Sequence, residues 1–382
     1  MVAYPSEKIA AAALGRHRQS HRALLRDLAP LVDAVVVPAS RPVQQLAVAV
    51  KVAEDLGARF VALCSRDARS AGLSAWIGKR PGLRWLAIDI PNSYQHPWLD
   101  FATSRVTEAK VERLGDLSLK RNLGVLLARL QEWRSVLFLD DDIEEVDMAA
   151  VWRGAAALGV ESMVGLPVDH FPDNSVVCHA NRYSGEAQKT FISGAALLVD
   201  CCQMNSFFPE VYNEDWMFLC RSLAKRKVAA TGSARQLEYD PFAEPDRAAD
   251  EEFGEVLAEG LTNLMHPSPG HKVVPLDMPA AAFEADYWRW FLRARADFTE
   301  QIATRIENQP PSDRTYAALL SLKVADDRRS NITAEQCAAY LKTWKHDTAD
   351  WCERWVRLQR SGTLRKALAS LDLVQYAQSP QL

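Results

Sequence analysis

The sequence predicts an α/β fold in which a mixed, mainly parallel sheet is flanked by helices and is followed by an all-helical C-terminal region. Three observations support this prediction. Short, uninterrupted apolar runs are typical of strands that are buried on both faces of a parallel sheet. These runs alternate with segments whose apolar residues recur at helical spacing. Beyond about residue 278 only the helical spacing remains.

The first elements form a strand–helix–strand unit. A strand over residues 34–37 is followed by a loop over residues 38–42, which two prolines punctuate. Helical spacing predicts a helix over residues 43–56, and Gly57 closes it. A second strand follows over residues 59–64. This order within about 30 residues predicts a βαβ unit with parallel strands and a right-handed crossover.

A helix and a buried strand lead into the most acidic part of the sequence. Ser118 is the expected N-cap, and leucines recur at helical spacing over residues 119–130. The apolar residues 136–139 then form a strand. Less regular segments predict a first helix over residues 5–30 and a third strand over residues 83–88.

The C-terminal region has the pattern of long helices. Apolar residues, Trp290 among them, keep helical spacing over residues 283–306, and the prolines in residues 310–312 end that pattern. A capping box formed by Thr333 and Gln336 opens another long helix. We expect the tryptophans of this region to be core or interface residues rather than a platform for a ligand.

The composition is that of an ordinary globular protein. Of the 382 residues, 48% are hydrophobic and 25% are charged, and the net charge of -4 gives no reason to expect a nucleic-acid partner. Seven cysteines without paired zinc spacing favour reduced thiols. The N-terminal residues lack a signal-peptide core, and no segment is apolar for long enough to span a bilayer. We therefore expect a cytoplasmic protein without a transmembrane segment.

Three carboxylates follow directly on the apolar strand at residues 136–139: Asp140, Asp141 and Asp142. Ligand sites in parallel sheets lie beyond the carboxyl ends of the strands. Adjacent carboxylates repel one another unless a positive group joins them, and a divalent cation shared with a phosphate-bearing substrate meets that need. The sequence therefore predicts a metal–diphosphate site here. The alternative is a solvated acidic loop that opens a helix.

Two neighbouring segments are candidates for binding a nucleotide. Lys120, Arg121 and Asn122 lie in the first turn of the predicted helix, where the helix N-terminus and the basic groups would act together on an anion. The alternative is that both basic side chains point to solvent. The loop over residues 38–42 lies at the same edge of the sheet, so its rigid backbone and Arg41 could hold a nucleotide. Otherwise this loop is only a stiff connector.

A glycine and an acidic pair follow in the second half of the predicted sheet. Gly194 lies in an apolar run, where a sugar ring packed against it and a β-bulge are both open possibilities. Glu214 and Asp215 fall in the first turn of a helix that Asn213 could cap. They could merely complement the helix dipole. Two adjacent carboxylates beside Trp216 also suit general-base work, because a neighbouring charge and desolvation raise a pKa.

Two histidines, His266 and His271, lie in a loop rich in proline and glycine. A loop histidine can complete a metal site that carboxylates only partly surround, and the alternative is simple exposure to solvent. The sequence contains neither a nucleophile elbow nor a phosphate-binding glycine loop of the ATPase type. These absences argue against a serine hydrolase and against a P-loop enzyme.

Taken in order, four motifs resemble the GT-A glycosyltransferases, especially those of the large family 2 type. They are the first strand with its loop start at residues 35–38, the basic-Asn helix start at residues 120–124, the DxD motif at residues 139–142 and the acidic motif at residues 208–215. The order and spacing of the four carry the resemblance, which covers roughly residues 33–272. It implies a Rossmann-like GT-A fold and a nucleoside-diphosphate sugar as donor.

The resemblance also implies roles by position. Asp142 would hold Mn²⁺ or Mg²⁺ on the diphosphate of a UDP- or GDP-sugar, with Asp140 near the metal and on the ribose or sugar. Asp215 would be the base of an inverting transfer, and Glu214 would orient it or the acceptor. Family members usually carry an acidic residue at the end of the second strand; here that position is either displaced to Asp67 or absent, which leaves the identity of the base open. The residues implied as donor-binding are Pro38, Ser40, Arg41, Asp67, Lys120, Arg121, Asn122, Asp140, Asp141 and Gly194.

We therefore expect a metal-dependent glycosyltransferase that moves a sugar to the hydroxyl of an unidentified acceptor. Its catalytic domain would occupy residues 1–277, with a nucleotide-sugar half over about 33–142 and an acceptor half over about 143–277. The helical region, residues 278–382, would shape the acceptor cleft or form a homodimer contact. The alternatives are a sugar nucleotidyltransferase, for which residues 38–42 are a poor phosphate loop, and an inactive nucleotide-sugar-binding scaffold.

Overall fold

The structure is a computed structural model. It describes residues 32–78, 80–106, 115–169, 171, 175–187, 192–265 and 278–382. The predicted helix over residues 5–30 and the two candidate metal ligands His266 and His271 lie outside these ranges.

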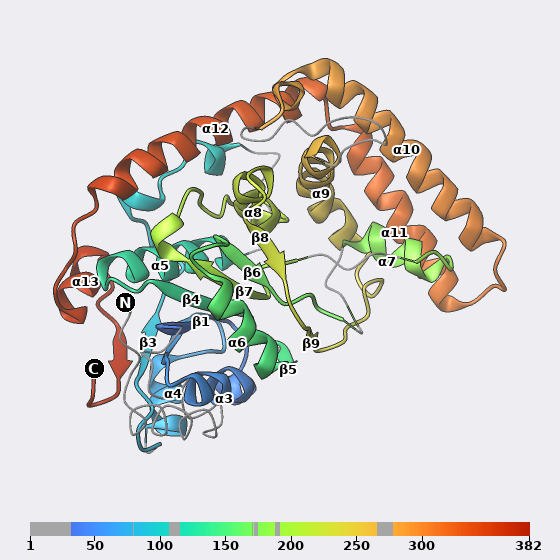
Figure 1. The fold of residues 1–382 in the computed structure, drawn as a ribbon. Helices are drawn as coiled ribbons and strands as arrows, with labels where there is room; N and C mark the ends of the chain where they lie inside the picture. Colours follow the sequence, from blue (N-terminus) through green and yellow to red (C-terminus); the bar gives the residue numbers. More distant parts are fainter. Residues whose placement is uncertain are drawn as a thin grey trace, which may run out of the picture.

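An eight-stranded sheet forms the centre of the fold, with the strand order β10-β3-β2-β1-β4-β7-β6-β8 (Figure 1). Only β7 and β10 run against the other six strands, so the prediction of a mixed, mainly parallel sheet is confirmed. A second sheet pairs β5 with β9. The strands are β1 Ala34–Ala39, β2 Arg59–Cys64, β3 Trp85–Asp89, β4 Ser135–Leu139, β5 Ile143–Val146, β6 Met163–Gly165, β7 Ala196–Asp200, β8 Val228–Ala230, β9 Ala234–Gln236 and β10 Tyr376–Gln378.

Helices cover both faces of the central sheet. Side chains alternate along β1, so that Val36 packs in the core cluster that contains the α5 leucines, whereas Val35 and Val37 pack with α3, α4 and α6. No helix in the described ranges combines the length and apolar character that a bilayer span requires. The α-helices are α3 Ala47–Leu56, α4 Ser70–Ile77, α5 Leu117–Leu130, α6 Met148–Ala157, α7 Val176–Tyr183, α8 Glu214–Ala224, α9 Asp246–Met265, α10 Ala285–Glu307, α11 Asp313–Ser330, α12 Ala334–Arg357 and α13 Leu364–Ser370. Short 3-10 helices are η1 Val43–Leu46, η2 Pro97–Leu99, η3 Thr103–Arg105, η6 Cys201–Gln203 and η7 Ala280–Phe283.

The first βαβ unit forms as predicted. β1 pairs in parallel with β2, and Gly57 ends α3 in the left-handed conformation with φ 63°, which glycine adopts without steric cost. One boundary differs, because β1 continues through Pro38 to Ala39 instead of ending at the proline. The fixed φ of proline is compatible with extended backbone, so the strand need not end there.

The start of α5 corrects one prediction. The helix begins at Leu117 with Asp116 at the N-cap position, and the Ser118 hydroxyl donates to the carbonyl of Pro209, 2.8 Å away, rather than capping the helix. Lys120, Arg121 and Asn122 are all buried, so the alternative in which the two basic side chains point to solvent is wrong.

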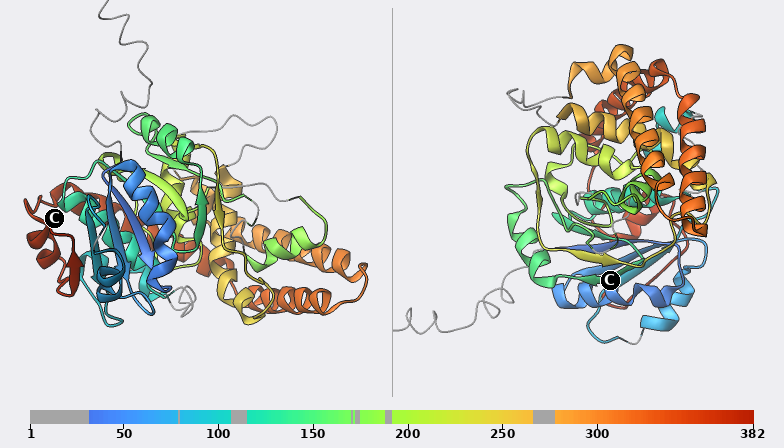
Figure 2. Two further views of the ribbon diagram at one scale, coloured as in Figure 1. Left: turned by 90° about the horizontal axis from the view of Figure 1, so that it is seen from below. Right: turned by 90° about the vertical axis from the view of Figure 1, so that its right-hand side faces the viewer.

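The C-terminal region is helical, as predicted, and the capping box of Thr333 and Gln336 is present. It is not entirely helical, because β10 near its end pairs antiparallel with β3 and extends the central sheet. The α10–α11 pair lies on the far side of the molecule from α3 and α4 (Figures 1 and 2). Because β10 belongs to the central sheet, the C-terminal region is joined to the edge of that sheet and is not a detached helical appendage.

The buried face of α10 is rotated from the predicted apolar stripe. Trp290 is 50% exposed, whereas Trp288 is fully buried. The inward-facing positions include Arg295, which pairs with Glu252 and Glu259 of α9, so a polar residue occupies the stripe. A helical stripe defined by apolar residues alone does not identify this buried face, because Arg295 and Thr299 belong to it. Its buried members are Trp288, Phe291, Leu292, Arg295, Thr299, Ile302 and Ile306.

Candidate functional site

The candidate site lies at the edge of the sheet where β1, β2 and β4 end. The backbone N–H groups of Ser40 and Arg41, just after β1, donate to Oδ2 of Asp141, just after β4, at 2.6 and 2.9 Å. Parallel neighbours end at the same edge of a sheet, which brings the two segments together. The predicted proximity of the first loop to the acidic triplet is therefore confirmed.

Arg41 neutralises two carboxylates of the triplet. Its guanidinium pairs with Asp141 and lies 3.1 Å from the carboxylate of Asp142. Asp141 is buried and holds the loop after β1, whereas the Asp142 side chain is 15% exposed and that of Arg41 is 42% exposed. The chain thus supplies a positive partner of its own. Repulsion within the triplet is therefore no longer an argument that a metal must be present.

Lys120 joins the ends of the first two strands. Its ammonium donates to the carbonyl of Ala39 and to the hydroxyls of Ser40 and Ser65, at 2.8, 2.9 and 2.7 Å. The Asp116 carboxylate lies 3.0 Å away. Three N–H donors are thereby used, so in this arrangement Lys120 positions the loops and offers no donor to a phosphate. Burial lowers the pKa of Lys120, against the opposing effect of Asp116.

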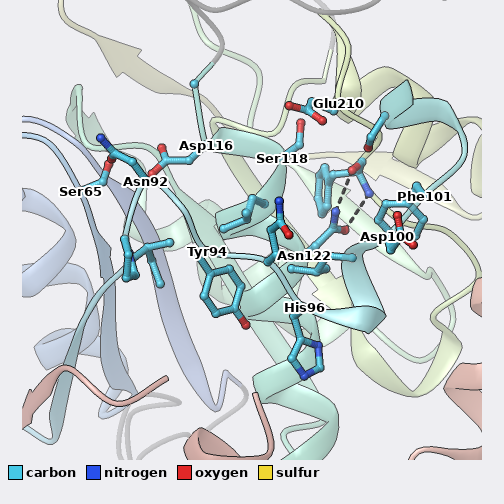
Figure 3. A pocket seen from close by; sticks show the side chains of 18 of the residues that line it. Ser65, Asn92, Tyr94, His96, Asp100, Phe101, Asp116, Ser118, Asn122 and Glu210 are labelled. Atoms are coloured by element: carbon cyan, nitrogen blue, oxygen red, sulfur yellow. Dashed lines mark hydrogen bonds between the residues drawn. The ribbon is translucent and has the colours of Figure 1, made fainter. Parts of the chain in front are cut away.

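Asn122 fixes the segment that leads to the acidic pair. Its amide nitrogen donates to the Phe208 carbonyl at 2.7 Å, and its amide oxygen accepts from the Phe208 N–H at 2.9 Å (Figure 3). The side-chain amide of Asn122 thus pairs with the backbone of Phe208 as a neighbouring strand would. The role of Asn122 is therefore to position the segment that leads to Glu214 and Asp215.

Arg121 is the centre of the site. Its guanidinium donates to both oxygens of Asp140 at 2.9 Å and pairs with Glu214 at the start of α8. The Arg121 side chain is only 3% exposed, and it passes so close to Gly194 that a Cβ there would lie 2.6 Å from its Cζ. One arginine thus connects the acidic triplet with the acidic pair of α8.

Gly194 lies in a turn before β7, so the alternative in which it is a β-bulge is wrong. Glycine is required there because the Arg121 guanidinium occupies the space that a side chain would take. Its backbone N–H donates to Oδ2 of Asp215 at 2.5 Å. The second oxygen of Asp215 accepts from the N–H of Trp216 at 2.8 Å.

The two members of the acidic pair have different surroundings. Burial, with the neighbouring Asp215 charge, raises the pKa of Glu214 to about 8 despite Arg121. Burial also raises the pKa of Asp215, but its two backbone N–H bonds favour the ionised form. A single guanidinium cannot neutralise Asp140, Glu214 and Asp215 together. One of these carboxyl groups therefore keeps its proton. We assign that proton to Glu214, so that Asp215 carries the negative charge.

Replacing Gly194 by alanine should lower the free energy of unfolding by about 1–3 kcal/mol. The new methyl would meet the guanidinium of Arg121, which its bonds to Asp140 and Glu214 hold in place. Urea denaturation measures the change. Gly72→Ala is the control, because a methyl there meets its nearest side chain at an ordinary 3.8 Å. Equal stabilities of the two variants would show that Arg121 is free to move.

The remaining candidate residues lie at or outside the edge of this cluster. The backbone N–H of Asp67 donates to the carbonyl of Ser40 at 3.1 Å, but Asp67 itself is exposed. Pro38 is buried within β1 and pairs in register with Leu63. Neither side chain is among the polar contacts of Arg41, Lys120 or Arg121 that define the site.

A cavity of about 890 Å³ borders the site at the carboxyl ends of β2 and β3 (Figure 3). It shares Ser65 and Asp116 with the Lys120 cluster, and Asn122 lines its floor. Half of its lining comes from residues 91–104, a segment that sequence reasoning missed as a site. The available signal was a group of aromatic and histidine residues among loop formers. The residues from this segment are Pro91, Asn92, Tyr94, Gln95, His96, Pro97, Leu99, Asp100, Phe101 and Ser104.

A second buried polar cluster lies along α9. Within the described residues, the one group with metal-ligand spacing is formed by Cys178, Glu255 and Glu259, whose ligand atoms lie within 4.8 Å of one another. Protein groups already use these carboxylates, because Glu255 accepts from Asn213 at 2.6 Å and Glu259 pairs with Arg295. Burial and the neighbouring carboxylates raise the pKa of Glu259 to about 8. We interpret this cluster as a hydrogen-bond network that ties α9 to its neighbours.

No family model matches this sequence, and no curated protein matches it at a significant level. An inference about function therefore depends on the chemistry of the site itself and on the motifs that lie there.

Proposed function

We propose that the protein is a metal-dependent glycosyltransferase that transfers a sugar from a nucleoside-diphosphate sugar to an acceptor hydroxyl. The observation that carries this proposal is the Arg121 bridge between Asp140 and Glu214. It joins the DxD-like triplet to the acidic pair, which are far apart in the sequence. A transferase of this kind needs a diphosphate-binding group and a base on either side of one reacting carbon.

Asp140, Asp141 and Asp142 do not bring three ligand atoms within 4.8 Å of one another in the described structure, so a divalent cation here would take part of its shell from the diphosphate and water. Carboxylate oxygens at a strand end are the ligands that Mg²⁺ and Mn²⁺ prefer. Asp142 would be the main ligand, since its side chain is partly exposed and its partner Arg41 is exposed enough to move away. Asp140 would contribute beside it while keeping Arg121. When bound, the cation would stabilise the negative charge that develops on the departing diphosphate.

Arg121 also retains a free donor for the substrate. Its Nε is buried without a hydrogen-bond partner in the described part of the chain. An N–H group left without an acceptor in a buried site is costly, and a sugar or phosphate oxygen next to Asp140 would satisfy it. This orphaned donor supports an oxygen-rich, anionic ligand at the site.

Asp215 would act as the general base of the transfer. It is the ionised member of the acidic pair, held by the N–H groups of Gly194 and Trp216. A raised pKa brings a carboxylate closer to the proton affinity needed at neutral pH. Protonated Glu214 would orient it and limit the negative charge of the cluster.

The order of the strands supports a location for the nucleoside. Asp215 bonds to the turn before β7, on one side of β4, whereas most residues that line the cavity follow β2 and β3 on the other side, with Phe208 and Glu210 also lining it. In an inverting displacement the base and the leaving group face opposite sides of the reacting carbon. The nucleoside end of the donor would therefore enter the cavity, with its diphosphate at Asp142.

Asp142→Ala should weaken the binding of a nucleoside diphosphate at least about tenfold in the presence of Mn²⁺, because the diphosphate loses its metal bridge. Isothermal titration of UDP and GDP, with and without Mn²⁺, measures this. Glu145→Ala is the matched control, since Glu145 follows on the same segment but is exposed and outside the cluster. Tight binding without turnover toward any acceptor would favour the scaffold alternative, and binding indifferent to both Mn²⁺ and Asp142 would refute the proposal.

A further inference from the structure

We infer that the C-terminal region forms part of the donor site, because α12 and α13 hold the wall of the cavity in place. This inference rests on the proposed function, which puts a nucleoside in that cavity. The wall, defined as residues 91–104, provides half of the lining. Hydrogen bonds join this wall to α12, to α13 and to Leu371, which lie more than 200 residues later in the sequence.

Asp347 of α12 is the main anchor of the wall. Its carboxylate accepts from the backbone N–H groups of Ala102 and Thr103 at 3.1 and 2.8 Å, and from the Thr103 hydroxyl at 2.8 Å. Thr103 is fully buried, so its two donors depend on Asp347, whereas the bond from Ala102 is exposed to solvent. Phe101 and Ser104, on either side of them, line the cavity. The conformation of the wall at this point therefore depends on one side chain of the helical region.

A second contact lies one and two turns further along α12. The guanidinium of Arg354 donates to the carbonyl of Pro97 at 2.9 Å and lies over the ring of Trp98, 5.0 Å from its centroid. Trp351 packs against Trp98 and Phe101, with ring centroids 6.0 and 5.9 Å apart. The wall is thus held by aromatic packing as well as by hydrogen bonds.

The region after α12 holds the other end of the wall. The Tyr94 hydroxyl donates to the carbonyl of Leu371 at 2.6 Å, and Nε2 of His96 lies 3.1 Å from the carbonyl of Ser370. The two rings are nearly parallel, with an interplanar angle of 8°. Their polar ends are engaged by the protein, so their faces and edges are what they offer to a ligand (Figure 3).

The chemistry of the wall suits a nucleobase. Aromatic faces bind bases by stacking, which is worth about 1–3 kcal/mol per base in proteins that bind single-stranded nucleic acids. Asn92 and Gln95 add amide donors and acceptors for the edge of a base. The helical region therefore acts on donor affinity through the base, whereas Asp142 acts through the diphosphate.

This division gives a test that does not require turnover. UDP, GDP and inorganic pyrophosphate are titrated in the presence of Mn²⁺ into the full-length chain. Asp347→Ala should weaken the better of the two nucleotides at least about tenfold and leave pyrophosphate within about twofold, because only the wall is disturbed. Asp142→Ala should weaken all of them. Glu353→Gln is the matched control on α12, since Glu353 is exposed and pairs only with Arg357 among the described contacts.

Tyr94→Phe provides a second variant in case Asp347→Ala also loses pyrophosphate through a folding defect. It keeps the ring, removes one bond to the Leu371 carbonyl and should weaken the nucleotide about three- to fivefold. Nucleotide affinity unchanged in both variants would overturn the inference while leaving the proposed function intact. Failure of the unaltered protein to bind either nucleotide or pyrophosphate would instead overturn the proposed function, and this inference with it.

Discussion

Asp215→Asn is expected to lower turnover about 100- to 10,000-fold, the usual contribution of a positioned general base. Asparagine keeps the shape of the side chain, and its amide oxygen can still accept the N–H of Gly194 or Trp216. It cannot take a proton from an acceptor hydroxyl. The dissociation constant of the nucleoside diphosphate should stay within about twofold, because the proposed function puts the nucleoside and the diphosphate on the far side of the reacting carbon.

The measurement is the rate of sugar transfer, or of slow donor hydrolysis where the acceptor is unknown, alongside titration of the nucleotide. Glu214→Gln is the sharp control. If Glu214 is the protonated member of the pair, glutamine imitates its state and should retain most of the activity. The opposite result, with Glu214→Gln inactive and Asp215→Asn active, would reverse the two roles. Near-normal turnover in both variants would remove the acidic pair from the mechanism.

Arg121→Met is expected to reduce the free energy of unfolding by about 3–5 kcal/mol, the cost of leaving buried charges without their partner. Arg121 is 2% exposed and is the one guanidinium that contacts both Asp140 and Glu214 in the described structure. Methionine replaces much of its volume, so the loss reports mainly on charge. Arg153→Met, which breaks an exposed pair with Asp147 at 3.4 Å, should have a far smaller effect.

The loss of unfolding free energy caused by Arg121→Met should be larger at high pH than at low pH. Glu214 titrates near its ordinary value of 4.5 in the unfolded chain and near 8 in the folded protein. The folded protein therefore binds more protons between these values, and its stability falls as the pH rises through that window. Without Arg121 the fall should be steeper, because the deprotonated carboxylates then lack a cation. Urea denaturation at pH 5 and pH 8 measures this, and an equal loss at both pH values would contradict the assignment.

Local patterns in the sequence were sufficient for the strands and helices nearest the site. Uninterrupted apolar runs identified β1, β2 and β4, because a strand that is buried on both faces must be apolar along its length. Gly57 and the capping box at Thr333 marked helix ends through backbone conformation and local hydrogen bonds. The position of Asp140, Asp141 and Asp142 at the carboxyl edge followed from the strand before them.

Contacts between distant segments decided the partners of the site residues. The basic character of Lys120 and Arg121 was visible in the sequence, but their exposed alternative was wrong, since Lys120 is saturated by loop oxygens and Arg121 bridges two acidic segments. The requirement for glycine at Gly194 arises only because that guanidinium passes beside it. None of these contacts has a local sequence signal, because each depends on which segments of the chain meet at one edge of the sheet.

The sequence by itself determined the class of fold, the order of its principal elements and the acidic groups available for chemistry, since periodicity and strand burial are local properties. Only the tertiary structure decided that Arg41 and Arg121 neutralise those groups and that α12 and α13 contact the segment over residues 91–104, which lines the neighbouring cavity. These partners lie between 19 and 274 residues apart, and they are set by packing and charge compensation in three dimensions, which no local pattern encodes.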